Sequence, residues 1–140
     1  MRKLSIVLTV ILAALLVPGI AFAQYGGLVS GQGFVEGTAS VTSTSSTSLI
    51  GVPGSGLYIY VSHFSCFNSG GTGTTVSLQN GSGGTTIWEG YAAASGGGFV
   101  VDFPTPIGGN TNMTVNTALY FAAGSNTTTL YCSAAGYKGS

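Results

Sequence analysis

The chain has 140 residues, of which 44% are hydrophobic and only 4% are charged, and its three basic residues balance its three acidic ones. This length fits one domain that is large enough to bury a core. So few basic residues argue against nucleic-acid binding, which depends on neutralising phosphates.

Residues 1–23 have the pattern of a secretory signal peptide. Arg2 and Lys3 precede an almost wholly apolar stretch, residues 4–17, and Ala21-Phe22-Ala23 forms a small-x-small cleavage motif. The apolar stretch has about 14 residues, fewer than the roughly 18 to 20 of a membrane-spanning helix, although an uncleaved anchor is the alternative. We expect the mature chain to begin at residue 24 and to be secreted, to the periplasm, cell surface or extracellular space, with no membrane span after cleavage.

The mature sequence predicts strands and no helix. Short β-branched or aromatic segments alternate with Gly, Ser and Asn, which is the pattern of an all-β protein. We expect a single antiparallel β-sandwich, jelly-roll-like, with seven or eight strands, in residues 49–140. Residues 24–48 are expected to form a flexible Gly/Ser/Thr-rich lead-in with a candidate edge strand. The strands are expected at residues 34–41, 57–67, 74–79, 85–91, 99–103, 115–122 and 127–135.

Two of these strands carry specific expectations. In residues 57–67, Ile59 and Val61 occupy one face and Phe64 the opposite face, and a change of phase near Ser62 indicates a bulge or burial on both faces. Pro104 and Pro106 are expected to end the strand at residues 99–103, because proline cannot donate to a sheet.

Cys66 and Cys132 are the two cysteines of the chain. In an oxidising compartment an even pair usually forms a disulfide, and both residues share a face with apolar neighbours. We expect a buried bridge between two long strands, with Cα atoms roughly 5 to 6 Å apart. Two free buried thiols are the alternative.

No catalytic, cofactor or metal site is predicted. Glu89 and Asp102 could form a carboxylate pair of the kind that glycosidases use, and His63 with Asp102 and a serine could form a triad. However, no Gly-x-Ser-x-Gly motif supports a nucleophile, and strand carboxylates are usually solvated. Two cysteines and one histidine also provide too few ligands for a metal.

Aromatic residues form the candidate interaction surface. Trp88, Tyr91, Tyr58 and Tyr60 could together make a platform for sugars, whose apolar faces stack on flat rings. The alternative is that Trp88 packs in the core or at a subunit interface. Asn-x-Ser/Thr sequences, which matter only if the host glycosylates, begin at Asn80, Asn112 and Asn126.

From about residue 49 onward, the chain resembles small β-sandwich proteins that tailed phages and prophages encode. The segments that carry the resemblance are GSGLYIYV (54–61), NGSGGTTIW (80–88), AAASGGGF (92–99), FPTP (103–106), NTAL (116–119) and GYKG (136–139). The resemblance implies a virion-associated structural or decoration-type domain that is oligomeric, and it implies no catalytic residues.

The sequence thus predicts a non-catalytic exported structural or interaction protein that assembles with itself or attaches to a surface. One alternative is a carbohydrate-binding module that recognises a surface polysaccharide. Another is a strand-exchange filament subunit, in which residues 24–47 would add a strand to an exposed sheet edge of a neighbour. An enzyme is the third alternative.

Overall fold

The computed structural model describes residues 33–126 and 129–140, so the expected signal peptide and its cleavage site lie outside the described residues. The described part of the chain contains eight strands and one short helix. They are β1 (Gly33–Val41), β2 (Thr47–Ile50), β3 (Tyr58–Asn68), β4 (Thr74–Asn80), β5 (Thr86–Ala92), β6 (Gly98–Gly108), α3 (Gly109–Asn112), β7 (Leu119–Ala123) and β8 (Leu130–Gly139).

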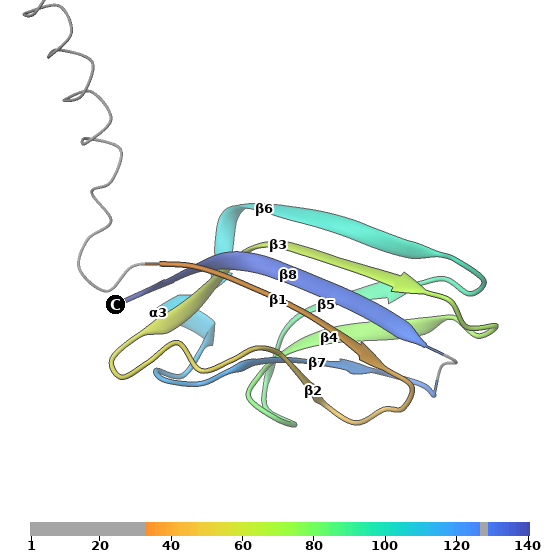
Figure 1. Ribbon diagram of the computed structural model, residues 1–140, viewed down its shortest axis with the longest axis horizontal. Coiled ribbons are helices and arrows are strands. Elements are labelled where there is room, and N and C mark those ends of the chain that lie inside the picture. The colour runs from red at the N-terminus through yellow and green to blue at the C-terminus, as the bar shows by residue number, and fades with distance from the viewer. Residues whose placement is uncertain (1–32, 127–128) are drawn as a thin grey trace, which may run out of the picture. The chain divides into compact units, whose positions relative to one another are not determined.

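The strands form two four-stranded antiparallel sheets that lie one over the other (Figure 1). Sheet A has the order β1-β8-β3-β6 and sheet B the order β2-β7-β4-β5. The first strand pairs with the last, and β2 with β7, β3 with β6 and β4 with β5 are also antiparallel neighbours. This nested pairing is the arrangement of a jelly roll. The predicted antiparallel β-sandwich is therefore confirmed, with eight strands.

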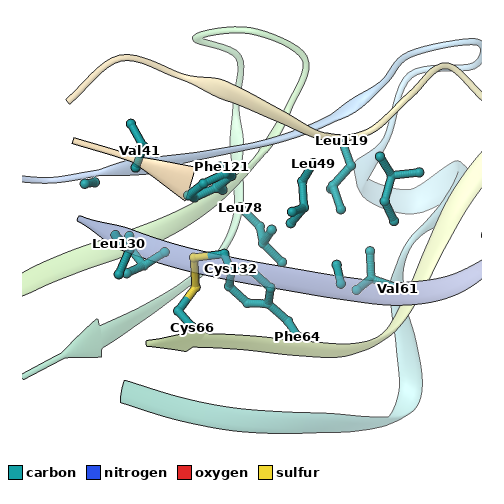
Figure 2. Close-up of a cluster of buried hydrophobic side chains, with 14 of the residues drawn as sticks. Val41, Leu49, Val61, Phe64, Cys66, Leu78, Leu119, Phe121, Leu130 and Cys132 are labelled. Carbon is teal, nitrogen blue, oxygen red and sulfur yellow. A yellow bond between two sulfur atoms is a disulfide. The ribbon is translucent and has the colours of Figure 1, made fainter. Parts of the chain in front are cut away.

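The core lies between the two sheets (Figure 2). Alternate residues of each strand point inward, so each sheet contributes one apolar face and exposes the other. The largest buried apolar side chains come from both sheets and are Phe64, Phe121, Ile59, Leu78, Leu119, Leu130, Val61 and Val76.

A β-bulge in β3 corrects the expected arrangement of that strand. The register of β3 with β8 passes from Val61–Gly136 to His63–Ala135, so Ser62 is the extra residue. Because the bulge inverts the alternation of side chains, Phe64 is buried on the same face as Ile59 and Val61 rather than on the opposite face. The predicted bulge near Ser62 is confirmed.

The described part of the segment expected to be a lead-in, residues 33–48, contains β1 and the start of β2. β1 pairs with β8 without interruption over nine residues, and Gly37 lies so close to the Leu49 carbonyl that a Cβ at this position would clash with its oxygen. Within the described residues, the sandwich therefore includes residues ahead of 49, and β1 is an edge strand of sheet A. On the inward face of β1, Gly37 and Ala39 occupy positions where a strand usually has large apolar residues. The strand is therefore hard to recognise from the sequence.

Two further elements differ from expectation. β6 continues beyond Pro104 and Pro106 to Gly108, because the register with β3 passes from Asp102 to Ile107 and leaves both prolines outside the ladder. Where β6 ends, the described chain forms the four-residue helix α3, although no helix was predicted.

The predicted disulfide between Cys66 and Cys132 is confirmed (Figure 2). It joins β3 to β8 within sheet A, where the two cysteines are direct register partners. Their Cα atoms are 4.1 Å apart, closer than expected, because antiparallel residues in a non-hydrogen-bonded pair approach to about 4.5 Å. Both side chains are buried, as predicted.

Asn68, at the end of β3, is a fully buried polar residue whose side chain makes several hydrogen bonds to the backbone. Its Nδ2 donates to the Thr72 carbonyl at 2.8 Å and to the Ala92 carbonyl at 3.4 Å, and its Oδ1 accepts from the Gly70 N–H at 2.9 Å. The side chain therefore connects the β3–β4 turn to the end of β5.

We expect Asn68→Ala to lower the free energy of unfolding by about 2 to 3 kcal/mol, because it leaves buried backbone groups without partners. Urea unfolding monitored by tryptophan fluorescence measures this loss. The control is Gln79→Ala, which removes an amide side chain that is only partly buried on the adjacent strand β4 and should cost about 1 kcal/mol. Equal losses for the two variants would contradict the role of Asn68.

Candidate functional site

The outer face of sheet A places side chains from all four strands in rows that cross the sheet. The registers of β1 with β8, β8 with β3 and β3 with β6 define these rows. In order along the sheet they are Phe34–Tyr137–Tyr60, Glu36–Ala135–His63–Asp102, Thr38–Ser133–Ser65–Val100 and Ser40–Tyr131–Phe67–Gly98. Aromatic rings thus occupy both ends of the face, and polar residues lie between them.

The first row, Phe34, Tyr137 and Tyr60, is called the aromatic strip below. Tyr60 and Tyr137 stack with ring centroids 4.8 Å apart and ring planes at 8°. The Tyr60 ring also lies directly against Gly109, where it leaves no room for a Cβ. Phe34, on the edge strand β1, is 69% exposed. The strip therefore combines an ordered aromatic stack with an exposed ring at the sheet edge.

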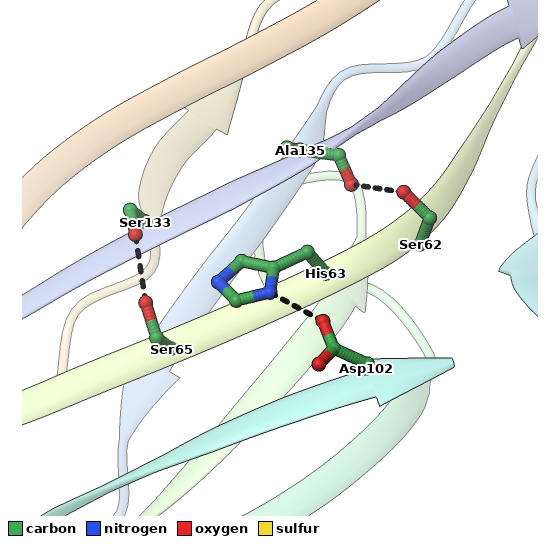
Figure 3. Close-up of polar contacts among 6 residues, drawn as sticks. All are labelled: Ser62, His63, Ser65, Asp102, Ser133 and Ala135. Atoms are coloured by element: carbon green, nitrogen blue, oxygen red, sulfur yellow. Dashed lines mark hydrogen bonds and ion pairs between the residues drawn. The ribbon is translucent and has the colours of Figure 1, made fainter. Parts of the chain in front are cut away.

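The second row carries the charged groups of this face. His63 Nδ1 lies 2.7 Å from Asp102 Oδ1 (Figure 3), and since a carboxylate only accepts hydrogen bonds, Nδ1 is the donor. Asp102 is 79% exposed and His63 37%, so solvent screens the pair and its contribution to stability is small. The pair makes this part of the face polar.

The third row provides hydroxyl groups. Ser65 Oγ and Ser133 Oγ lie 2.8 Å apart across β3 and β8 (Figure 3). Beyond them, in the fourth row, the rings of Phe67 and Tyr131 are tilted by 34° with centroids 6.5 Å apart. The third and fourth rows line a surface groove of about 840 Å³.

The structure does not bring the four predicted platform residues together. Trp88 points inward from β5 and packs on Phe64 and Phe99, with ring centroids 5.5 and 5.2 Å away. Tyr91, three residues further on, is 64% exposed and projects from the outer face of sheet B, because successive strand residues alternate. Tyr58 and Tyr60 belong to sheet A and are only partly exposed. Trp88 is partly buried and packs against the core, as the alternative interpretation has it.

The candidate catalytic groups are also separated. Glu89 is exposed on β5 of sheet B, whereas Asp102 is exposed on β6 of sheet A, so these carboxylates do not form a pair. His63 does meet Asp102, but no hydrogen bond joins a serine to the His63 ring within residues 33–126 and 129–140. Those residues also contain no cluster of three or more His, Cys, Asp or Glu side chains that could hold a metal.

The three Asn-x-Ser/Thr sites differ in their surroundings. The Asn80 side chain donates to Thr114 Oγ1 at 2.9 Å and accepts from the Thr114 N–H at 3.1 Å, so it is already engaged. Asn112 and Asn126 are exposed. In the described part of the chain, no helix is long and apolar enough to cross a membrane.

Sequence reasoning missed the most exposed aromatic residues of sheet A, namely Phe34, Phe67, Tyr131 and Tyr137. Each lies on a predicted strand or at its margin, but their grouping depends on β1 and β3 both pairing with β8. The available signal was the alternation in β8, where Tyr131 and Ser133 occupy the face opposite Leu130 and Cys132.

No protein-family model and no curated protein matches the sequence. Among solved structures, the chain is similar to a chain of the cyanophage Pam1 capsid asymmetric unit. The sequence identity is 13% and the TM-score is 0.44, and the match covers 76% of this chain and 84% of that chain. These comparisons therefore assign the chain to no family.

Proposed function

We propose that this chain is an exported, non-catalytic structural protein that assembles with copies of itself through the aromatic strip of sheet A. The observation that carries the proposal is the distribution of exposed large hydrophobic side chains. Eight such side chains are exposed in the described part of the chain, and five of them lie on the outer face of sheet A. Two of these five, Phe34 and Tyr137, belong to the aromatic strip, and the other three, Phe67, Val100 and Tyr131, lie at the groove. Apolar residues gathered on one face are typical of an interaction surface.

The aromatic strip suits contact with a second copy. Aromatic residues are enriched at the centres of protein interfaces, and charged residues occur at their rims. Glu36 lies next to the strip along β1 and on the same face of sheet A. In a two-fold contact centred on the strip, Glu36 would lie at the rim.

Low charge and open strand edges also support self-association. Without residues 1–23, the chain contains one cation, Lys138, and three carboxylates, so its net charge is −2. Electrostatic repulsion between copies is therefore weak. Pro104 and Pro106 protect the edge strand β6, but β1 and β5 contain neither proline nor lysine. Contact at the strip would also cover the adjoining edge of β1.

The exported and non-catalytic parts of the proposal rest on separate observations. A disulfide is typical of oxidising compartments, and residues 1–23 have the signal-peptide pattern. Glu89 lies on sheet B and Asp102 on sheet A, where it forms the exposed pair with His63. This separation of the carboxylates favours a structural role. The resemblance to virion-associated β-sandwich proteins implies the same class of role, that of a subunit or decoration domain in an assembly.

The strand-exchange alternative is less well supported than contact through the strip. Within residues 24–47, β1 already pairs with β8 of its own sheet. This segment would therefore have to leave its own domain before it could add a strand to a neighbour.

We expect the mature chain, residues 24–140, to form a discrete oligomer, and Phe34→Ser to weaken its association at least tenfold. The exposed Phe34 ring is lost from the strip without a change in the core, and burial of one aromatic ring contributes about 1.4 kcal/mol or more, which is tenfold in affinity. Light scattering coupled to size-exclusion chromatography, over a series of concentrations, measures this change.

Tyr91→Ser is the matched control, because Tyr91 is as exposed as Phe34 but lies on the outer face of sheet B. It should leave association unchanged. A wild-type chain that stays monomeric at its solubility limit, or equal effects of the two substitutions, would reject assembly through the strip.

A further inference from the structure

The opposite end of the same face contains the groove of about 840 Å³, which the aromatic strip does not use. It crosses all four strands of sheet A. Since neighbouring strands lie about 4.8 Å apart, the floor is about 14 Å wide from β1 to β6. The hydroxyl and aromatic side chains along it include Thr38, Ser40, Ser65, Ser133, Phe67 and Tyr131.

The floor of the groove has unused hydrogen-bonding capacity. Each hydroxyl provides one donor and two acceptor positions, and the single bond between Ser65 and Ser133 uses one of each. Thr38 and Ser40, on β1, are exposed, and their hydroxyls bond to no other group in the described residues. A ligand with many hydroxyl groups could therefore bond to several positions across the floor.

Two aromatic rings lie beside these hydroxyls. Phe67 and Tyr131 are 49% and 52% exposed, so about half of each side chain is available to a ligand. Gly98 is the register partner of Phe67 on β6, and a Cβ there would clash with the Cys66 carbonyl oxygen. Because glycine is required at this position, β6 places no side chain at the register position beside Phe67.

The groove also discriminates by charge. None of its lining residues is acidic, basic or histidine, and the carboxylates Glu36 and Asp102 lie one row away. An anionic ligand would find no cation and would be repelled by these neighbours. A purely apolar ligand would cover the hydroxyl groups without replacing their hydrogen bonds to water, which is costly.

From this chemistry we infer that the groove binds a neutral polysaccharide. The Tyr131 and Phe67 rings stack on the apolar faces of sugar rings, and the hydroxyls of Ser65, Ser133 and Thr38 bond to sugar hydroxyls. The site is independent of the assembly proposed above and does not involve Trp88 or Tyr91. It would attach the folded domain to a glycan surface.

Affinity electrophoresis of the mature chain in gels containing β-glucan, mannan or xylan tests the inference, with alginate as the anionic counterpart. At least one neutral polymer should retard migration, and alginate should not. Tyr131→Ala should weaken the binding about tenfold, which corresponds to the loss of one aromatic contact. The double substitution Ser65→Ala/Ser133→Ala should weaken it several-fold.

Two controls separate this site from the aromatic strip. Tyr91→Ala removes an exposed tyrosine from sheet B, and Phe34→Ser changes the strip. Both variants should retain full binding in dilute samples. Circular dichroism shows whether each variant is folded. Absence of retardation by all three neutral polymers, retardation by alginate alone, or undiminished binding by both Tyr131→Ala and the double serine variant would overturn the inference while leaving the assembly test unaffected.

Discussion

Replacing both cysteines, as Cys66→Ala/Cys132→Ala, should lower the free energy of unfolding by about 4 kcal/mol. The two residues are separated by 66 positions in sequence, so the bridge removes a large loop-closure entropy from the unfolded chain. Since domains of this size are stable by only about 5 to 15 kcal/mol, the variant should be close to the limit of folding. Chemical denaturation of the oxidised wild type and of the variant provides the measurement.

The neighbouring pair of residues supplies a matched control for this prediction. Ser65 and Ser133 face each other on the same two strands, one position away from the cysteines, and are joined by a hydrogen bond instead of a covalent bond. Ser65→Ala/Ser133→Ala should cost only about 1 kcal/mol. Similar losses for the two double variants would mean that the disulfide adds little beyond ordinary strand pairing.

The number and direction of the strands were predictable because their signals are local. Residues 74–79 and 85–91 flank an Asn-Gly turn and became β4 and β5, which pair as a hairpin. The disulfide could also be predicted, since two cysteines in an exported chain have few alternatives. In both cases the information lies within a short segment or in the composition.

The candidate site could not be predicted in the same way, because it depends on pairing between distant residues. Phe34 and Tyr137 lie near opposite ends of the described chain, and they become neighbours only through the register of β1 with β8. The strand β1 itself gave a weak signal, since Gly37 and Ala39 replace large apolar residues on its inner face. The sequence left two placements of Trp88 open for a related reason, because its exposure depends on Phe64 and Phe99 from sheet A.

A chain that begins at Leu49, the expected start of the sandwich, should fail to fold. It would lack all of β1 and half of β2, each of which forms one edge of its sheet. The loss of β1 exposes the edge of β8 along nine residues, removes Val41 from the core and uncovers its partner Leu130. Each large apolar side chain that is lost or exposed costs about 1.5 to 3 kcal/mol, so a few of them cancel the whole stability of a domain this size.

Circular dichroism and the cooperativity of urea unfolding measure this outcome, and a chain that begins at Gly33 is the matched control. That control retains every strand that the structure describes and should unfold in a single cooperative transition. The comparison also separates folding from assembly, because Phe34→Ser alters the same strand without removing its pairing to β8. If the chain from Leu49 were folded and as stable as the control, β1 would be dispensable for folding. It would then be free to reach a neighbouring molecule, as the sequence predicted for residues 24–47.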